Sequence, residues 1–140
     1  MRDDIARALA RGGSAVIAER TVDITTTGRT SGEPRRIEIV FYSFDGDVYL
    51  SGIPAPTRRS WLANLAAEPL FTFHLKNDVV ADLSARATII EDPDERRRVL
   101  SVFVEQFNDR RAADSPYPVA VLDEWVDSAP LAKVTFLDND

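Results

Sequence analysis

The 140-residue sequence contains no cysteine, one histidine (His74) and one methionine, and these scarcities exclude several classes of function. Without cysteine there are no disulfides, thiolate metal sites or cysteine nucleophiles. A single histidine excludes a His-cluster zinc site and leaves a Ser-His triad or a haem only one candidate side chain. No apolar run approaches a membrane-spanning length, and the N-terminus lacks the apolar core of a secretory signal. We therefore expect a cytoplasmic protein without a metal site.

Acidic residues outnumber basic ones, and the formal net charge is −6. This balance disfavours binding to a long nucleic-acid backbone. The arginines are nevertheless concentrated, because residues 28–36 carry three of them against one glutamate, and Arg58 and Arg59 add two more. If these segments meet in the fold, they form a basic patch suited to a small anion. We expect small-molecule partners and no nucleic acid, with a homodimer left open.

The sequence predicts a single domain over residues 1–140, with 44% hydrophobic residues and no repeats or linker. Alternating or β-branched patterns predict strands over 21–27, 36–44, 47–52, 70–76, 81–90 and 131–137. Asp45-Gly46 is a two-residue hairpin signal. Helices are predicted over 3–19, from a cap at Thr57 to Ala67, and over 92–108 and 119–127. Six short antiparallel strands favour a mainly β fold with flanking helices, closed into a small barrel.

Residues 24–36 read ITTTGRTSGEPRR and join a β-branched strand to a turn rich in glycine and arginine. Gly28 and Gly32 allow backbone N–H groups to face an anion, and Ser31 adds a hydroxyl. Arg29 and Arg35 each offer a fork of donors that fits a phosphate. The same residue types are also typical of a solvated hairpin, and composition alone leaves that alternative open.

The string TTGRTSGEPR at 26–35, followed by WLANLAAEP at 61–69, resembles the deazaflavin (coenzyme F420)-dependent nitroreductase family of split β-barrel oxidoreductases. The resemblance extends over roughly residues 20 to 90 and implies a six-stranded antiparallel split β-barrel. It also implies hydride transfer from reduced F420 to an electron-poor acceptor, an enone or a nitro compound. The cofactor residues implied in this way are Thr27, Gly28, Arg29, Thr30, Ser31, Gly32, Pro34, Arg35, Ser51, Arg58, Arg59 and Trp61.

The chain departs from the family pattern at two places. Thr30 stands where many members have lysine, and residues 52–56 form a shorter loop than the one that carries a further lysine in nitroreductase members. Nearby arginines can replace the missing charges. The acceptor pocket has no motif, and Tyr117, Trp125 and Phe107 are its aromatic candidates. FMN as cofactor, a non-catalytic binder of deazaflavin or another small anion, and a module without ligand remain alternatives.

Four further predictions concern single side chains or faces. Trp61 is interpreted either as a core residue or as a border of the phosphate groove, and Asn64 as a structural hydrogen-bonder. His74 lies on the polar side of its strand and is expected to be solvated or paired. The arginines at 96–98 are expected to form the solvated face of their helix.

Overall fold

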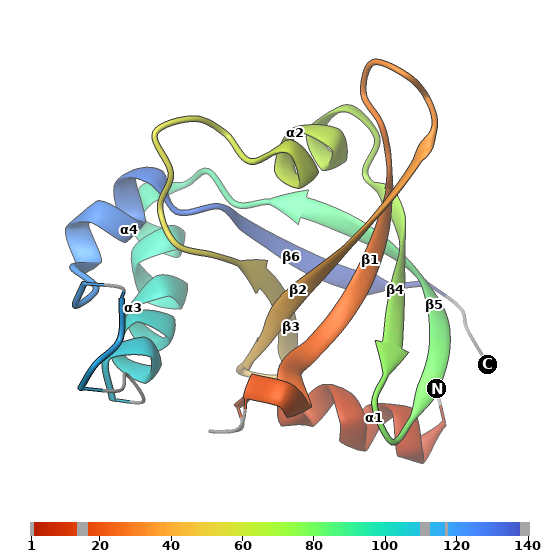
Figure 1. The fold of residues 1–140 in the computed structure, drawn as a ribbon, viewed down its shortest axis with the longest axis horizontal. Helices are drawn as coiled ribbons and strands as arrows, with labels where there is room; N and C mark the ends of the chain where they lie inside the picture. Colours follow the sequence, from red (N-terminus) through yellow and green to blue (C-terminus); the bar gives the residue numbers. More distant parts are fainter. Residues whose placement is uncertain (1, 14–16, 110–112, 117, 138–140) are drawn as a thin grey trace.

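Six antiparallel strands close into a barrel in the computed structural model, which describes residues 2–13, 17–109, 113–116 and 118–137 (Figure 1). The strands are β1 (Thr21–Thr27), β2 (Pro34–Phe44), β3 (Asp47–Ser51), β4 (Leu70–Lys76), β5 (Val80–Ile89) and β6 (Leu131–Phe136). Their order is β1-β2-β3-β6-β5-β4, and β4 pairs with β1 to complete the closure. The predicted six-stranded antiparallel barrel is confirmed.

The two hairpins that lead into and out of β2 have different lengths. Asp45 and Gly46 both have positive φ, 54° and 82°, which is the backbone of the predicted two-residue turn between β2 and β3. At the other end, β1 and β2 pair as far as Thr27 and Pro34, so residues 28–33 form a longer turn that projects from the barrel (Figure 1). This longer turn carries the glycine and arginine motif.

In the part of the chain that the structure describes, four α-helices surround the barrel: α1 (Asp3–Ala10), α2 (Ser60–Ala67), α3 (Pro93–Asp109) and α4 (Leu122–Ser128). Helix α1 lies across one end of the barrel, whereas α2 lies at the end that carries the β1–β2 turn; α3 and α4 lie together at the side (Figure 1). Among the described residues, no helix is long and apolar enough to cross a membrane.

Three predicted helix boundaries are wrong, and one of them is the start of the last helix, which begins at Leu122 rather than at residue 119. The first helix ends at Ala10 and is followed by short 3₁₀ turns at Arg11–Gly13 and Ile17–Arg20, rather than running to residue 19. After this helix, Gly12 packs so closely on β2 that an added Cβ would lie 2.4 Å from the Ser43 nitrogen, so only glycine fits there. Helix α2 begins at Ser60 with Arg59 as its N-cap, so Thr57 does not cap it.

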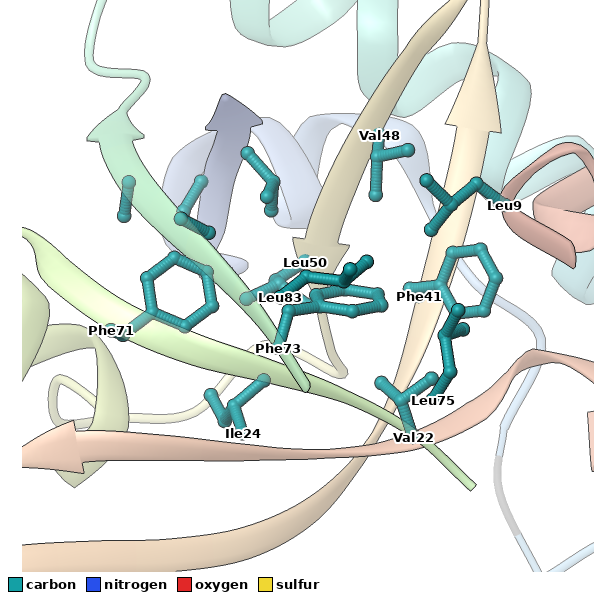
Figure 2. Close-up of a cluster of buried hydrophobic side chains, with 14 of the residues drawn as sticks. Leu9, Val22, Ile24, Phe41, Val48, Leu50, Phe71, Phe73, Leu75 and Leu83 are labelled. Atoms are coloured by element: carbon teal, nitrogen blue, oxygen red, sulfur yellow. The ribbon is translucent and has the colours of Figure 1, made fainter. Parts of the chain in front are cut away.

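The barrel interior is filled by alternate side chains of the strands, as the period of two predicted. Phe41, Phe73, Leu50 and Leu83 point toward one another in its centre (Figure 2), and the Phe41 and Phe73 rings meet edge to face with centroids 5.6 Å apart. A second cluster of buried side chains joins Tyr49 on β3 to α3 and α4. The barrel is therefore rigid behind the turn that it carries.

Arg96 corrects the prediction that the three arginines of α3 form a solvated face. Arg97 and Arg98 are exposed, but Arg96 is half-buried and its guanidinium donates to backbone carbonyls at the end of α4 and after β5. The acceptors are the carbonyl oxygens of Ile90, Trp125, Val126 and Ala129, at 2.6–3.1 Å. Because burial disfavours the charged form, the pKa of Arg96 is lowered.

Candidate functional site

The turn between β1 and β2 is held by its own backbone. The Gly28 N–H donates to the Glu33 carbonyl and the Gly32 N–H donates to the Gly28 carbonyl, both at 2.8 Å. The Glu33 N–H donates to Ser31 Oγ at 3.1 Å. Gly32 has a φ of +70°, and a Cβ on Gly28 would lie 2.6 Å from Ser31 Oγ. Both glycines are therefore required by the shape of the turn.

Asn64 of α2 ties this turn to the helix. Its Oδ1 accepts hydrogen bonds from the Arg29 backbone N–H at 3.1 Å and from Arg29 Nη1 at 3.0 Å. Its Nδ2 donates to Thr26 Oγ1 at 3.2 Å. Asn64 and Thr26 are both buried, with 5% and 2% of their surfaces exposed. The prediction that Asn64 is a structural hydrogen-bonder is confirmed.

A cavity of about 540 Å³ lies between the turn and the beginning of α2. It is lined by Thr26, Gly28, Arg29, Thr30, Ser31, Arg35, Ile37, Ser60, Trp61 and Asn64. Within the described part of the chain, the backbone N–H groups of Thr30 and Ser31 donate to no partner. Helix α2 likewise has no side-chain cap, so its first N–H groups and the positive end of its dipole remain available beside the cavity.

The two arginines of the cavity carry charge that no carboxylate of the described residues neutralises. Neither Arg29 nor Arg35 lies within 4 Å of an Asp or Glu oxygen among the residues that the structure places. Arg35 is exposed, and its only hydrogen bond there is a long one of 3.4 Å from Nη2 to Ser31 Oγ. Free backbone N–H groups, a helix N-terminus and guanidinium groups without a carboxylate partner among the described residues are the kinds of donor that bind an anion.

Arg58 and Arg59 do not join Arg29 and Arg35 in this cavity. They line a second hollow of about 380 Å³ on the side of α2 that faces the end of β5 and α4. Arg58 lies 3.8 Å from a carboxylate oxygen of Glu91, and Arg59 Nη2 donates to the Ile53 carbonyl at 2.8 Å. Arg36, the fifth arginine of the two segments, lines neither hollow and pairs with Asp23, with Nε 3.0 Å from Oδ2. The five arginines therefore do not form one patch.

Of the other residues that were predicted for the cofactor site, most do not line the cavity. Thr27, Gly32 and Pro34 belong to the strand ends and the turn but do not line the cavity. Ser51 is buried, and its hydroxyl donates to the Pro130 carbonyl at 2.7 Å. Trp61 combines both interpretations, because it packs against the barrel core and also lines the cavity.

The aromatic candidates for an acceptor pocket lie away from this cavity. Trp125 is 3% exposed in the second hydrophobic cluster, where its ring lies 5.5 Å from that of Phe107. Tyr117 lies outside the described residues. The structure therefore gives Trp125 and Phe107 a packing role and brings neither of them to the turn.

The cavity also contains residues that the sequence-based site did not include: Thr26, Ile37, Ser60 and Asn64. Thr26 and Asn64 belong to the two quoted motifs, and their hydrogen bond joins one motif to the other. Ser60 precedes Trp61 at the first position of α2. The sequence signal for them was the pairing of the motifs, which predicts contact between the segments but not which side chains meet.

The His74 side chain is paired with two other side chains, which confirms one of the two expectations for it. On the outer face of the barrel, Nδ1 lies 2.7 Å from Asp82 Oδ1 and Nε2 lies 2.7 Å from Thr25 Oγ1. The imidazole is buried, with 7% of its surface exposed. These contacts link β1, β4 and β5, and His74 does not line the cavity between the turn and α2.

Several solved structures share this fold. Rv2991, a conserved hypothetical protein of Mycobacterium tuberculosis, aligns over 97% of this chain and 81% of its own, with 22% identity and a TM-score of 0.61. A Listeria innocua protein described as a pyridoxamine 5′-phosphate oxidase aligns over 96% and 91%, with 13% identity and a TM-score of 0.60. The F420H2-dependent reductase FDR-A aligns over 83% and 94%, with 21% identity and a TM-score of 0.53. The fold is the split β-barrel of flavin-binding type.

The family is shown by the sequence itself. The model of the F420H2-dependent quinone reductase family matches residues 6–124, and the chain belongs to this family. It is therefore an oxidoreductase that uses coenzyme F420, as the resemblance implied. None of the curated proteins compared with the chain matches it.

Proposed function

We propose that the chain binds the phosphate of reduced F420 in the cavity between the β1–β2 turn and α2, and that it reduces a quinone. The observation that carries this proposal is the convergence of free anion donors on one cavity. Thr30 and Ser31 offer backbone N–H groups, Arg29 and Arg35 offer unpaired guanidinium groups, and α2 adds its uncapped N-terminus. A phosphate accepts hydrogen bonds from all three kinds of donor.

The residues present fit this cofactor in charge and in shape. The absence of a Cβ at Gly28 lets Ser31 Oγ lie close to it, and in this turn the Thr30 and Ser31 N–H groups have no partner among the described residues. Each charge-assisted hydrogen bond contributes about 1.5 to 3 kcal/mol, so two or three of them together with stacking of the cofactor ring support micromolar binding. Trp61 supplies an aromatic wall in the same cavity, against which a planar ring system can pack.

When bound, reduced F420 supplies a hydride, which is two electrons and one proton. A quinone that takes up this hydride and one proton from water becomes a hydroquinone, so the balance needs no protein acid. The family name supports a quinone, and a quinone is also an activated enone, one of the two acceptor classes that the resemblance implied. The chain's own part is to hold donor and acceptor in contact, about 3 to 3.5 Å apart, and to exclude water.

Anaerobic oxidation of reduced F420 by menadione, followed by absorbance, tests this proposal. We expect an enzyme-dependent rate well above the uncatalysed one, with one hydroquinone formed per cofactor oxidised. An activated enone and a nitroaromatic compound, assayed in parallel, rank the acceptors. Tight F420 binding without turnover of any acceptor would favour the non-catalytic binder, and preferential binding of FMN would favour a flavin enzyme.

A further inference from the structure

Asn64 makes three hydrogen bonds to the end of β1 and to the turn that follows it. One oxygen atom, Oδ1, accepts from both the backbone N–H and the Nη1 of Arg29, at 3.1 and 3.0 Å. The amide nitrogen of the same side chain donates to Thr26 Oγ1 at 3.2 Å. Because Asn64 is buried on the rigid helix α2, its carbonyl has little freedom to move. Arg29 is therefore bound at both its backbone and its side chain.

Two consequences follow for anion binding. The guanidinium of Arg29 is held at Nη1, which restricts its rotamers and leaves its Nε and Nη2 donors for a ligand. An arginine that is ordered before binding loses less conformational entropy when the anion arrives. The same contacts fix the N-terminus of α2 relative to Thr30 and Ser31, which line the cavity with it.

We propose that Asn64 is a positioning residue: it aims the Arg29 guanidinium, and it holds the turn against α2 so that donors from both elements meet one phosphate. This inference rests on the proposed function, because it concerns the same cavity. It adds a role for a side chain that need not touch the cofactor. It also predicts that Asn64 and Arg29 act as one unit.

A double-mutant cycle with Asn64→Ala and Arg29→Ala tests this coupling. We expect Asn64→Ala to raise the F420 dissociation constant about tenfold, the loss of one well-placed charge-assisted bond. The double variant is expected to bind at least about threefold more tightly than the product of the two single effects predicts. Fully additive effects, or wild-type affinity for Asn64→Ala, would overturn the proposal.

Asn108→Ala is a matched control, because Asn108 of α3 also bridges two segments, through hydrogen bonds to the N–H and the carbonyl of Ala120. Its loss should lower the melting temperature as Asn64→Ala does but leave F420 affinity within about twofold of wild type. A comparable affinity loss in Asn108→Ala would show that general destabilisation, and not positioning, explains the result.

A second measurement separates this inference from the proposed function. Amide hydrogen exchange at Arg29 should accelerate in Asn64→Ala and be restored in part by Asn64→Asp, which keeps an acceptor oxygen at the same place. The cycle is then repeated with inorganic phosphate, followed at the amide signals of Thr30 and Ser31. Phosphate coupling without F420 binding would refute the proposed cofactor alone, whereas additive phosphate effects or unchanged exchange would refute the role of Asn64.

Discussion

Arg35→Ala is the most informative single substitution, because Arg35 contributes to the cavity and almost nothing to the fold. Its side chain is exposed, it pairs with no carboxylate among the described residues, and its hydrogen bond to Ser31 Oγ is 3.4 Å long. Removing it should change the free energy of unfolding by less than about 0.5 kcal/mol, as for other surface positions. In contrast, a charge-assisted bond to a phosphate contributes about 1.5 to 3 kcal/mol.

The expected result is a rise in the F420 dissociation constant of roughly tenfold to 150-fold, from the same range of energies. Fluorescence titration of F420 measures it, and thermal unfolding measures the stability. Arg7→Ala is the control, because Arg7 is an exposed arginine of α1 at the opposite end of the barrel (Figure 1). The difference in F420 affinity between the two variants should shrink as the salt concentration rises, because the Debye screening length falls to about 10 Å near 0.1 M. Unchanged affinity in Arg35→Ala, or an equal loss in Arg7→Ala, would refute the reasoning.

Three further predictions concern the turn, the α3 arginine and pH. Gly28→Ala should weaken F420 binding and destabilise the fold by about 1 to 3 kcal/mol, measured by titration and by urea unfolding, because its Cβ meets Ser31 Oγ at 2.6 Å. Arg96→Met should destabilise by about 2 to 4 kcal/mol in urea, because four carbonyls lose their donor, with unchanged F420 affinity in the folded fraction. The hydrogen bond from Lys76 lowers the pKa of Asp23, so its stabilisation is present above about pH 4 and is lost as pH falls through the lowered pKa. Urea unfolding from pH 5 to pH 3 should therefore show a smaller loss of stability in Asp23→Asn than in the wild type; an equal loss would contradict this.

The strands could be predicted from the sequence because alternation and hairpin signals are local. The elements that were misplaced depend on contacts from distant segments. The first helix ends at Ala10, and Gly12 directly after it packs against the backbone of β2; no residue near Gly12 in the sequence indicates this contact with Ser43. Arg96 is adjacent to two exposed arginines, yet three of its four acceptors lie about thirty residues further along the chain. Local pattern alone could not distinguish it from its neighbours.

Only the part of the candidate site that has a local signal in the sequence could be predicted. The turn at residues 28–35 was recognisable because glycine, serine and arginine stand together in the sequence, and most of its predicted residues line the cavity. The structure places Arg58 and Arg59 at the second hollow, because the charge of these residues and their proximity to Trp61 in the sequence do not define which hollow their side chains line. The hydrogen bond between Thr26 and Asn64, which joins the two motifs, required the three-dimensional structure.

Amide chemical-shift mapping with F420 tests the central claim most directly, because it reports both whether the cofactor binds and where. The account predicts saturable shifts that are largest at Thr30, Ser31 and Trp61, the amides that line the cavity between the turn and α2. FMN is expected to bind only nonspecifically, so FMN added at the same concentration as F420 should leave the pattern of shifts unchanged. Shifts concentrated around Arg58 and Glu91 in the second hollow, or displacement of F420 by equimolar FMN, would contradict the account.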